Sequence, residues 1–257
     1  MSNSHYQKII DMNYIPVGLG DDEFSDKWIK DKDGKNISHK NKFYGEYTFH
    51  YWLWKNNFLN QNFENWIGFC TYRRFWSKSN PKKKHFNLID DVINKVPDEW
   101  KEYDSVLVEP IYTNITKLSK ILKHGKKQLI KNPFLFFNKN KITIKVHFDM
   151  YHGDGNLDRA VDLLESHERE SFRNFVKREI AFNPYNMFIC RSKKILFDYY
   201  SSVFPWLEKC EEIFEFEMKD SYGKKRIYGF LAERYLSFWF RNYANSITWP
   251  VYFKDIS

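Results

Sequence analysis

The sequence predicts an α/β protein in which a mostly parallel sheet is flanked by helices, within a single domain that covers residues 1–257. Two observations support this fold class. Short apolar runs, typical of buried strands, alternate with longer segments whose apolar residues recur at helical spacing. The chain is also 42% apolar and 19% aromatic, which supplies enough large side chains for a packed core and aromatic rings that could line a sugar-binding cleft.

The first part of the chain is predicted to contain three strands and two helices. One helix is indicated by aromatic residues at helical spacing from Tyr44 to Trp54, with Ser38 or Asn41 as its cap. Pro110 stops the last of the strands. The predicted elements are a strand at 14–19, a polar loop at 20–42, a helix at 42–56, a buried strand at 66–72, a helix at 88–95 and a buried strand at 105–108.

The second part of the chain is predicted to be richer in helix. Its first segment, about 114–145, is rich in Lys and Asn around an apolar patch, and we interpret it as a helical insertion into the domain. The remaining predicted elements are a charged helical stretch at 156–180, a strand at 186–191, a long helix at 192–216 and a last helix at 228–243.

The charge and the cysteines restrict the partners and the compartment. A net charge of +8 favours phosphate-bearing partners. Lys82–Lys84 and the group Lys123, Lys126 and Lys127 indicate either a solvated basic face or a peripheral contact with the inner face of the plasma membrane. A nucleic-acid partner is not expected, because the aromatic residues lie at periodic, core-like positions. Three widely spaced cysteines, no signal peptide and no membrane span predict a cytoplasmic protein.

Tyr72 ends the predicted strand 66–72, and Arg73 and Arg74 directly follow it. At the carboxyl end of a strand, two guanidinium groups can hold a diphosphate through bidentate hydrogen bonds. Such a grip suits transfer of a sugar from a nucleotide sugar, because negative charge develops on the departing diphosphate. The alternative is an ordinary surface pair of arginines.

The loop at 31–41 offers a second set of polar side chains. Asp31 and Asp33 match half of a calcium loop, but the later Glu is missing, so an EF-hand is excluded. The side chains that could bind a ribose or a phosphate are Asn36, Ser38, Lys40 and Asn41. A capped turn before a helix explains Ser38 and Asn41 equally well.

Two further segments could carry acid–base chemistry. Residues 147–158 hold two histidines and three aspartates around a glycine turn, which suits metal binding or proton transfer, although a polar loop before a capped helix is the alternative. Asp149, His152 and Asp158 are the candidates there. Glu233 and Arg234 lie in the segment 229–234 that opens the last helix, where Glu233 could act as a base, form a surface pair, or form a buried ion pair with Arg234 or another arginine. The zincin, P-loop, serine-hydrolase and dinucleotide-binding motifs do not occur.

Six ordered motifs resemble a large bacterial family of capsular and exopolysaccharide glycosyltransferases, long known only as a domain of unknown function. That family carries a DNIS-x-KN loop, an E-x-T-x-x-YW-x-WKN helix, an IGLCHYRRYF strand end, an H-x-x-x-DLD segment, an NMFI strand and a GFxxERL helix. The corresponding segments here are KNISHKN (35–41), EYTFHYWLWKN (46–56), IGFCTYRRFW (67–76), HGDGNLD (152–158), NMFI (186–189) and GFLAERYL (229–236).

The resemblance implies a GT-A-like enzyme. It would move a hexose, with galactose or galactofuranose favoured, from a UDP-linked donor onto a capsule, lipooligosaccharide or exopolysaccharide acceptor that can be lipid-linked. Glu233 would be the general base, with Asp149 and Asp158 as second choices. The substrate or the nucleotide would be bound by Asn186, Arg234 and His152, together with the polar residues of the loop at 31–41 and the Tyr-Arg-Arg residues. A catalytically degenerate sugar- or nucleotide-binding module within a polysaccharide assembly complex is the alternative.

Three departures from the family pattern matter. Thr71 stands where the family has a His before Tyr-Arg-Arg. No Asp-x-Asp metal motif occurs at this strand end, so Mn²⁺ or Mg²⁺ is not favoured as a cofactor, no metal-ligating residue is assigned, and Arg73 and Arg74 would take the place of the metal. The chain begins near His5 without the first strand of the family, which would weaken binding of the nucleotide base.

Overall fold

The structure is a computed structural model that describes residues 5–56, 66–78, 87–135, 137–216 and 222–256. The chain divides into two compact units. Unit 1 comprises Met1–Glu109, Tyr185–Tyr200 and Tyr243–Ser257, and unit 2 comprises Pro110–Pro184 and Ser201–Asn242. Each unit is therefore built from segments that lie far apart in the sequence.

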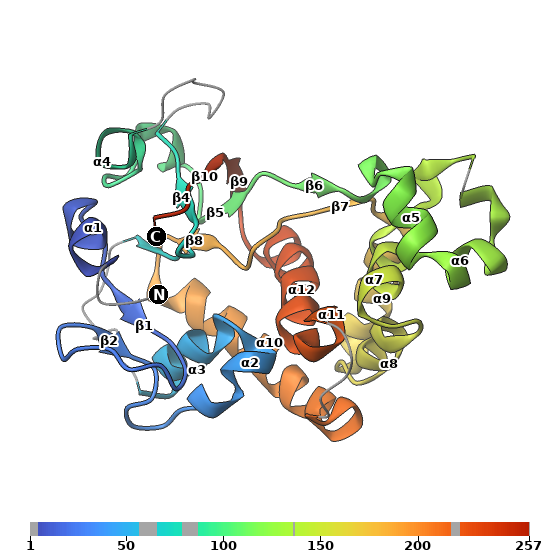
Figure 1. Cartoon of the computed structure of the whole chain (residues 1–257), viewed down its shortest axis with the longest axis horizontal. Coiled ribbons are helices and arrows are strands. Elements are labelled where there is room, and N and C mark those ends of the chain that lie inside the picture. The colour runs from blue at the N-terminus through green and yellow to red at the C-terminus, as the bar shows by residue number, and fades with distance from the viewer. Residues whose placement is uncertain (1–4, 57–65, 79–86, 136, 217–221, 257) are drawn as a thin grey trace. The chain divides into compact units, whose positions relative to one another are not determined.

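A four-stranded mixed sheet forms the centre of unit 1 (Figure 1). Its order is β3 (Ile67–Gly68), β8 (Phe188–Cys190), β5 (Ser105–Val108) and β9 (Ser246–Trp249). β8 runs antiparallel to both of its neighbours, and only β5 and β9 are parallel. The α/β class is confirmed, but the expectation of a mostly parallel sheet is wrong, because β8 enters between β3 and β5 in the opposite direction rather than through a βαβ crossover.

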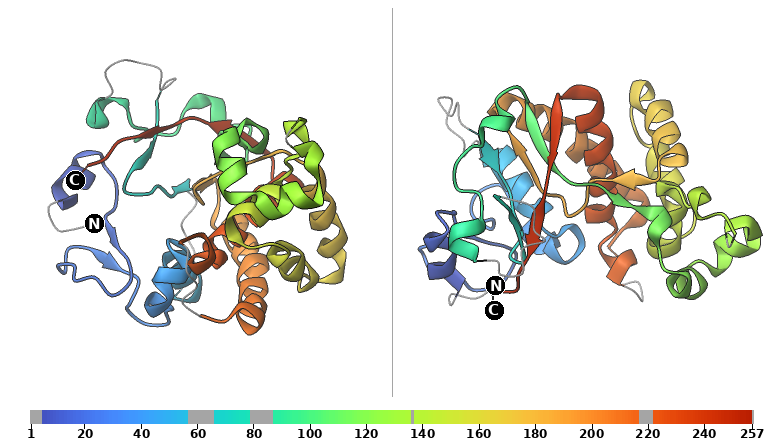
Figure 2. Two further views of the ribbon diagram at one scale, coloured as in Figure 1. Left: turned by 45° about the vertical axis from the view of Figure 1, so that its right-hand side comes forward. Right: turned by 90° about the horizontal axis from the view of Figure 1, so that it is seen from above.

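Two further strand pairs belong to unit 1. β1 (Val17–Gly18) and β2 (Ile29–Lys30) are parallel, and β4 (Arg74–Trp76) is antiparallel to β10 (Val251–Phe253), a pairing that can be followed in Figure 2. The sequence interpretation missed β9 and β10, although the run ITWPVYF at 247–253 is almost entirely apolar. The helices of this unit are α1 (Tyr6–Asp11), α2 (Asn41–Tyr44), α3 (Tyr47–Asn56), α4 (Leu88–Asp91) and the first turns of α10 (Lys193–Phe214).

The predicted helix at 42–56 is two helices, because Gly45 has a φ of +62°, which ends α2. One face of α3 packs on the sheet and on α10. The His50 ring stacks on Phe188 with centroids 5.4 Å apart, and its Nδ1 lies 2.6 Å from the hydroxyl of Tyr200. The hydroxyl groups of Tyr47 and Tyr199 lie 2.5 Å apart. These contacts fix the start of α3 beside β8.

Apolar side chains bury both faces of the central sheet of unit 1. Val106 and Val108 of β5 are buried together with Met187 and Ile189 around β8, and tryptophans close the cluster. A second cluster joins α1 to β4 through Ile9, Met12, Trp28, Phe75, Val92 and Ile256. Burial of this apolar area is the main force that stabilises the unit.

Unit 2 is mainly helical (Figure 1). Its only strands among the described residues are β6 (Ile111–Tyr112) and β7 (Ala181–Phe182), which are antiparallel. Its helices are α5 (Leu118–His124), α6 (Lys126–Lys131), α7 (Ile144–His152), α8 (Asn156–Asp162), α9 (Ser166–Arg178), the remainder of α10, α11 (Tyr222–Lys225) and α12 (Ile227–Tyr243). The interpretation of 114–145 as an insertion into a single domain stays a prediction.

The centre of unit 2 is α12, which is buried along most of its length. Phe172 of α9 contacts Trp206 of α10 and both Tyr235 and Phe238 of α12, with ring centroids 5.0–5.9 Å apart. The hydroxyl of Tyr235 donates to Glu168 at 2.6 Å, so a polar group inside this core is paired. Among the described residues, no helix is long and apolar enough to span a bilayer.

Candidate functional site

The Tyr-Arg-Arg motif forms a tight turn in unit 1. The amide of Arg74 donates to the carbonyl of Thr71 at 3.2 Å, and β4 begins at Arg74. The predicted strand at 66–72 is therefore too long: β3 ends at Gly68, and Arg73 lies in the turn rather than at a strand end. β10 pairs with β4 and holds the position of this turn.

Aromatic rings hold the guanidinium of Arg74. Its Cζ lies 3.9 Å from the ring centroid of Tyr185 and 5.6 Å from that of Phe253. Among the described residues, no acceptor hydrogen-bonds to this guanidinium and no carboxylate pairs with it. Stacking uses the face of a guanidinium and leaves its N–H edge for hydrogen bonds. Arg74 therefore presents a fixed positive charge with open donors.

The backbone beside this arginine is strained. Tyr185 and Asn186 have φ angles of +74° and +53°, a conformation that costs non-glycine residues free energy and that clusters at functional sites. The side chain of Asn186 donates to Glu46 Oε1 at 2.7 Å. Glu46, Arg74 and Asn186 come from three of the motifs described above, so the fold brings these motifs together around one strained turn.

Arg73 differs from Arg74 in having a counter-charge. Its Nε lies 3.1 Å from Asp255 Oδ2, in an ion pair that lacks the alignment of a hydrogen bond. Its guanidinium also lies 4.7 Å from the centroid of the Tyr72 ring, which is half exposed. Of the two arginines predicted to bind a diphosphate, only Arg74 has an unopposed charge.

Most of the predicted polar residues of the loop at 31–41 hydrogen-bond within the loop itself. Asn36 donates to the carbonyls of Lys32 and Gly34 and accepts from the amide and the hydroxyl of Ser38. Asn41 donates to the carbonyl of Gly45 at 2.9 Å. Lys40 is half buried at the end of the 3-10 helix Ser38–Lys40. Neither Ser38 nor Asn41 caps α2, because Lys40 occupies the N-cap position and no side-chain hydrogen bond caps this helix. The proposed binding roles of Asn36, Ser38, Lys40 and Asn41 stay predictions.

Sequence reasoning assigned no role to Asp31. The side chain is fully buried at the end of β2, where Oδ1 accepts from the amide of Gly20 at 2.8 Å. Burial raises the pKa of this carboxyl above its usual range. Hydrogen bonds with Thr48 and with the amide of Gly20 oppose this rise. The signal available in the sequence was an acid two residues after the apolar pair Trp28-Ile29 and eleven residues after Gly20.

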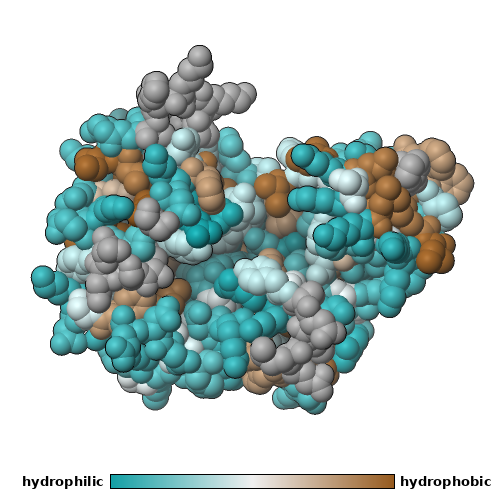
Figure 3. All heavy atoms as spheres, viewed as in Figure 1, coloured by the Kyte–Doolittle hydropathy of each residue, from teal (hydrophilic) through white to brown (hydrophobic). Residues whose placement is uncertain are grey.

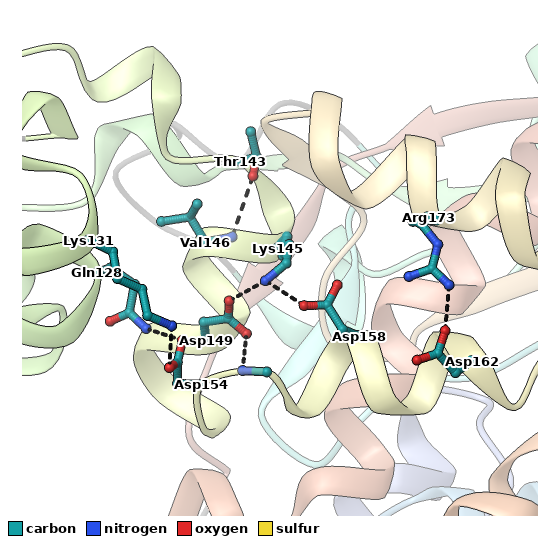
Figure 4. Close-up of polar contacts among 11 residues, drawn as sticks. Gln128, Lys131, Thr143, Lys145, Val146, Asp149, Asp154, Asp158, Asp162 and Arg173 are labelled. Atoms are coloured by element: carbon teal, nitrogen blue, oxygen red, sulfur yellow. Dashed lines mark hydrogen bonds and ion pairs between the residues drawn. The ribbon is translucent and has the colours of Figure 1, made fainter.

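In unit 2, Asp149 and Asp158 share one lysine. Lys145 Nζ lies 2.6 Å from Asp149 Oδ2 and 2.9 Å from Asp158 Oδ2 (Figure 4). Asp149 Oδ1 accepts from the amide of Gly155 at 3.1 Å, so this buried carboxylate also fixes the glycine turn. Burial raises the pKa of Asp149, and the contact with Lys145 opposes that rise. Both oxygens of Asp149 have structural partners.

The other polar residues of 147–158 are also bound to separate partners. Asp154 accepts from Lys131 at 2.6 Å and from Gln128 at 3.2 Å. The Nδ1 of His152 lies 3.0 Å from the carbonyl of Gly223, so this nitrogen donates. In the part of the chain that the structure describes, no three His, Cys, Asp or Glu side chains form a group that could hold a metal ion. The expectation that no metal ligand is present stays a prediction.

Glu233 and Arg234 form a buried ion pair on α12. Glu233 Oε2 contacts Nη1 of Arg234, whose side chain is only 2% exposed. The guanidinium lies 4.0 Å from the ring of Phe182 and within 6 Å of Phe148 and Phe230. Burial lowers the pKa of Arg234, and Glu233 opposes this. The structure therefore places the predicted base in a buried ion pair with Arg234, the alternative in which Glu233 is structural.

Two histidines on α7 share the surroundings of Arg234. Burial and the charge of Arg234 lower the pKa of His147 to about 3, and they lower that of His152 well below its usual range. His152 stacks on Phe230 with centroids 4.0 Å apart. Both imidazoles are neutral at physiological pH. His147 was not a predicted site residue, and only its helical spacing from Tyr151 indicated a position facing the core.

Comparison with known proteins defines the family. A model of the family described as "Domain of unknown function (DUF4422)" matches residues 2–245. The chain belongs to this family. No curated protein matches the chain.

A solved structure shares the fold. The DUF4422 chain is similar to the "WbbM bifunctional glycosytransferase apo structure", with a TM-score of 0.61 and 22% sequence identity over 88% of this chain. The similarity covers 39% of that longer chain. At this identity the likeness shows the fold, and it confirms an α/β architecture that a glycosyltransferase also has.

Proposed function

We propose that this DUF4422 protein transfers a hexose from a nucleotide sugar to a glycan acceptor. The donor would be UDP-linked, with galactose or galactofuranose favoured, and the acceptor a capsule, lipooligosaccharide or exopolysaccharide chain. The observation that carries the proposal is Arg74, whose charge is fixed by Tyr185 and Phe253 and whose donors are open. The shared fold with a bifunctional glycosyltransferase supports it.

The chemistry requires such a group. When the glycosidic bond of a nucleotide sugar breaks, negative charge accumulates on the leaving diphosphate, and a positive group that is already in place stabilises that charge without reorganisation. Arg74 would donate its N–H edge to the phosphate oxygens, and charge-assisted hydrogen bonds of this kind are the strong ones. Arg73 would contribute less, since Asp255 already opposes its charge.

For the acceptor side, Glu233 stays the proposed general base. A base must reach the acceptor hydroxyl, and it must be ionised. Glu233 contacts the guanidinium of Arg234, and 11% of its side chain is exposed. Asp149 and Asp158 are weaker candidates, because Lys145 holds both and Asp149 also holds the Gly155 turn.

A second candidate function is a binding module that has lost catalysis. This alternative is favoured by one observation: each carboxylate proposed as a base is already paired with a lysine or an arginine. Such a module would bind the donor through Arg74 but would release no nucleoside diphosphate.

Titration calorimetry and product analysis with UDP-galactose and UDP-galactofuranose test both functions. Arg74→Ala should weaken donor binding by about 1.5–3 kcal/mol, the value of a hydrogen bond to a charged group. Arg241→Ala is the matched control, because Arg241 forms a mostly exposed ion pair with Glu179 on unit 2. Binding without any released UDP would favour the module. Equal binding by wild type and Arg74→Ala would contradict the assignment of Arg74.

A further inference from the structure

The positive charge of the chain is concentrated in one segment. Residues 110–148 contain nine lysines and no Asp, Glu or Arg. Because the net charge of the entire chain is +8, the rest of the chain is close to neutral. This segment includes α5, α6 and the 3-10 turns Pro133–Leu135 and Lys139–Lys141 of unit 2.

The same segment exposes large apolar side chains. Ile130 of α6 and Phe137 are each 81% exposed, and Phe134 is 65% exposed. Leu118 and Leu122, which lie one turn apart on α5, are also exposed. Figure 3 shows hydrophobic surface gathered over the end of unit 2 that carries α5 and α6. A group of exposed Phe, Ile and Leu residues on one small region needs an explanation.

The core of the segment does not need these side chains. Ile121, Leu135, Ile142 and Met150 form a buried cluster, against which Leu129, Val146 and Tyr151 pack. The exposed apolar residues alternate with these buried ones along the sequence. The segment therefore has an inner face, which packs in the core, and an outer face, which is exposed to solvent. The outer face is thus apolar although the inner face already provides the packing.

Most lysines of the segment have no counter-charge. Lys131 pairs with Asp154 and Lys145 with Asp149 and Asp158. No described acid pairs with the others, which are Lys117, Lys120, Lys123, Lys126, Lys127, Lys139 and Lys141. Lys141 Nζ lies 5.1 Å from the ring of Phe134, so positive charge and apolar surface are in direct contact.

We propose that this face docks on an anionic phospholipid membrane. The docking surface consists of Leu118, Leu122, Ile130, Phe134 and Phe137 together with the seven unpaired lysines. The apolar side chains would enter the boundary between headgroups and acyl chains, and the lysines would lie at the headgroups. Each lysine near an anionic leaflet adds to an electrostatic attraction that is screened by salt.

The composition of the surface favours a lipid over a nucleic acid. Proteins that bind single strands stack bases on aromatic rings and use Arg beside them, whereas this surface has no Arg and three of its five apolar residues are aliphatic. Aliphatic side chains gain by leaving water for a hydrocarbon region. The docking surface stands independently of the proposed sugar transfer, although it would bring such an enzyme to a lipid-linked acceptor.

Co-sedimentation of the full chain with vesicles tests the proposal. Vesicles of phosphatidylcholine alone should bind weakly, and vesicles that contain phosphatidylglycerol should bind strongly at low salt and less at high salt. Phe134→Ser with Phe137→Ser should reduce binding to the anionic vesicles by at least about ten-fold. Lys123→Glu with Lys127→Glu should do the same, since it reverses two charges near the headgroups.

Matched controls separate this surface from general effects. Ile15→Ser with Ile89→Ser removes exposed apolar residues of unit 1, and Lys95→Glu with Lys177→Glu reverses exposed lysines elsewhere, so both should bind vesicles as wild type does. Equal loss in the controls would overturn the proposal. The membrane proposal would also fail if single-stranded RNA displaced the vesicles and the variant Phe134→Ser with Phe137→Ser bound the vesicles as wild type does. That result would indicate a surface that binds polyanions in general. Donor binding should be unchanged in every variant, so failure here is distinct from failure of the transferase proposal.

Discussion

Arg74 in unit 1 and Arg234 in unit 2 are both held against aromatic rings, at 3.9 Å from Tyr185 and 4.0 Å from Phe182, yet their charges are balanced differently. Arg234 is almost completely buried and contacts Glu233. Arg74 is half-buried and has no acidic partner among the described residues. Aromatic stacking alone therefore does not identify a binding residue. The difference lies in whether the protein itself neutralises the guanidinium, and this predicts a structural role for Arg234 and a ligand-binding role for Arg74.

The largest expected effect is loss of the Glu233 charge. Glu233→Gln leaves Arg234 as an uncompensated buried charge, so the free energy of unfolding should fall by about 3–5 kcal/mol. Urea denaturation measures this change. The double variant Glu233→Gln with Arg234→Met removes both charges and should recover most of the loss. If Glu233→Gln unfolds like wild type while turnover is lost, Glu233 acts in catalysis rather than in stability.

The second effect concerns pH and the surroundings of Arg234. The pKa of His147 is lowered to about 3 in the folded protein, so the unfolded chain binds the proton first as the pH falls below about 6.5. The stability from this histidine is complete above that pH and is lost as the pH falls toward 3. Between pH 7 and pH 5 the unfolding free energy of the wild type should therefore fall by about 2 kcal/mol more than that of His147→Phe. Identical pH profiles of the unfolding free energy would show that His147 is not buried as a neutral group.

A smaller effect should follow from removing the ring that holds Arg74. Tyr185→Leu keeps an apolar side chain against the sheet but removes the π face, worth about 1 kcal/mol. The Kd for UDP-galactose should rise roughly five-fold, with the melting temperature nearly constant. Phe253→Leu is a useful companion, because its ring lies farther from the guanidinium, at 5.6 Å, and should matter less. A larger effect at Phe253 than at Tyr185 would reverse the assignment.

The smallest effect is expected at Asp255, which neutralises Arg73. Both side chains of this ion pair are more than 40% exposed, so its loss in Asp255→Asn should change the unfolding free energy by less than about 1 kcal/mol. Release of Arg73 should tighten UDP binding by about two-fold at low salt, and added salt should abolish the gain. Weaker UDP binding in Asp255→Asn would mean that this ion pair positions Arg73 for the diphosphate.

The sequence by itself determined the elements whose side chains form continuous patterns. The apolar run at 105–108 is a fully buried strand, and α10 and α12 lie where apolar residues recur at helical spacing. The family followed from the order of six short motifs, because their residue types and spacing can be read along the chain. The donor and acceptor specificity and the site roles drawn from that resemblance stay predictions.

Only the tertiary structure decided the strand directions and the partners of the polar side chains. The direction of β8 depends on residues more than 80 positions away, which no local pattern records. Likewise, Arg73, Arg74 and Arg234 are alike in sequence, and their difference arises because the fold places Asp255 beside the first and buries the third with Glu233. Electrostatic balance is set by distance in space and by burial, and neither of these can be read from position in the chain.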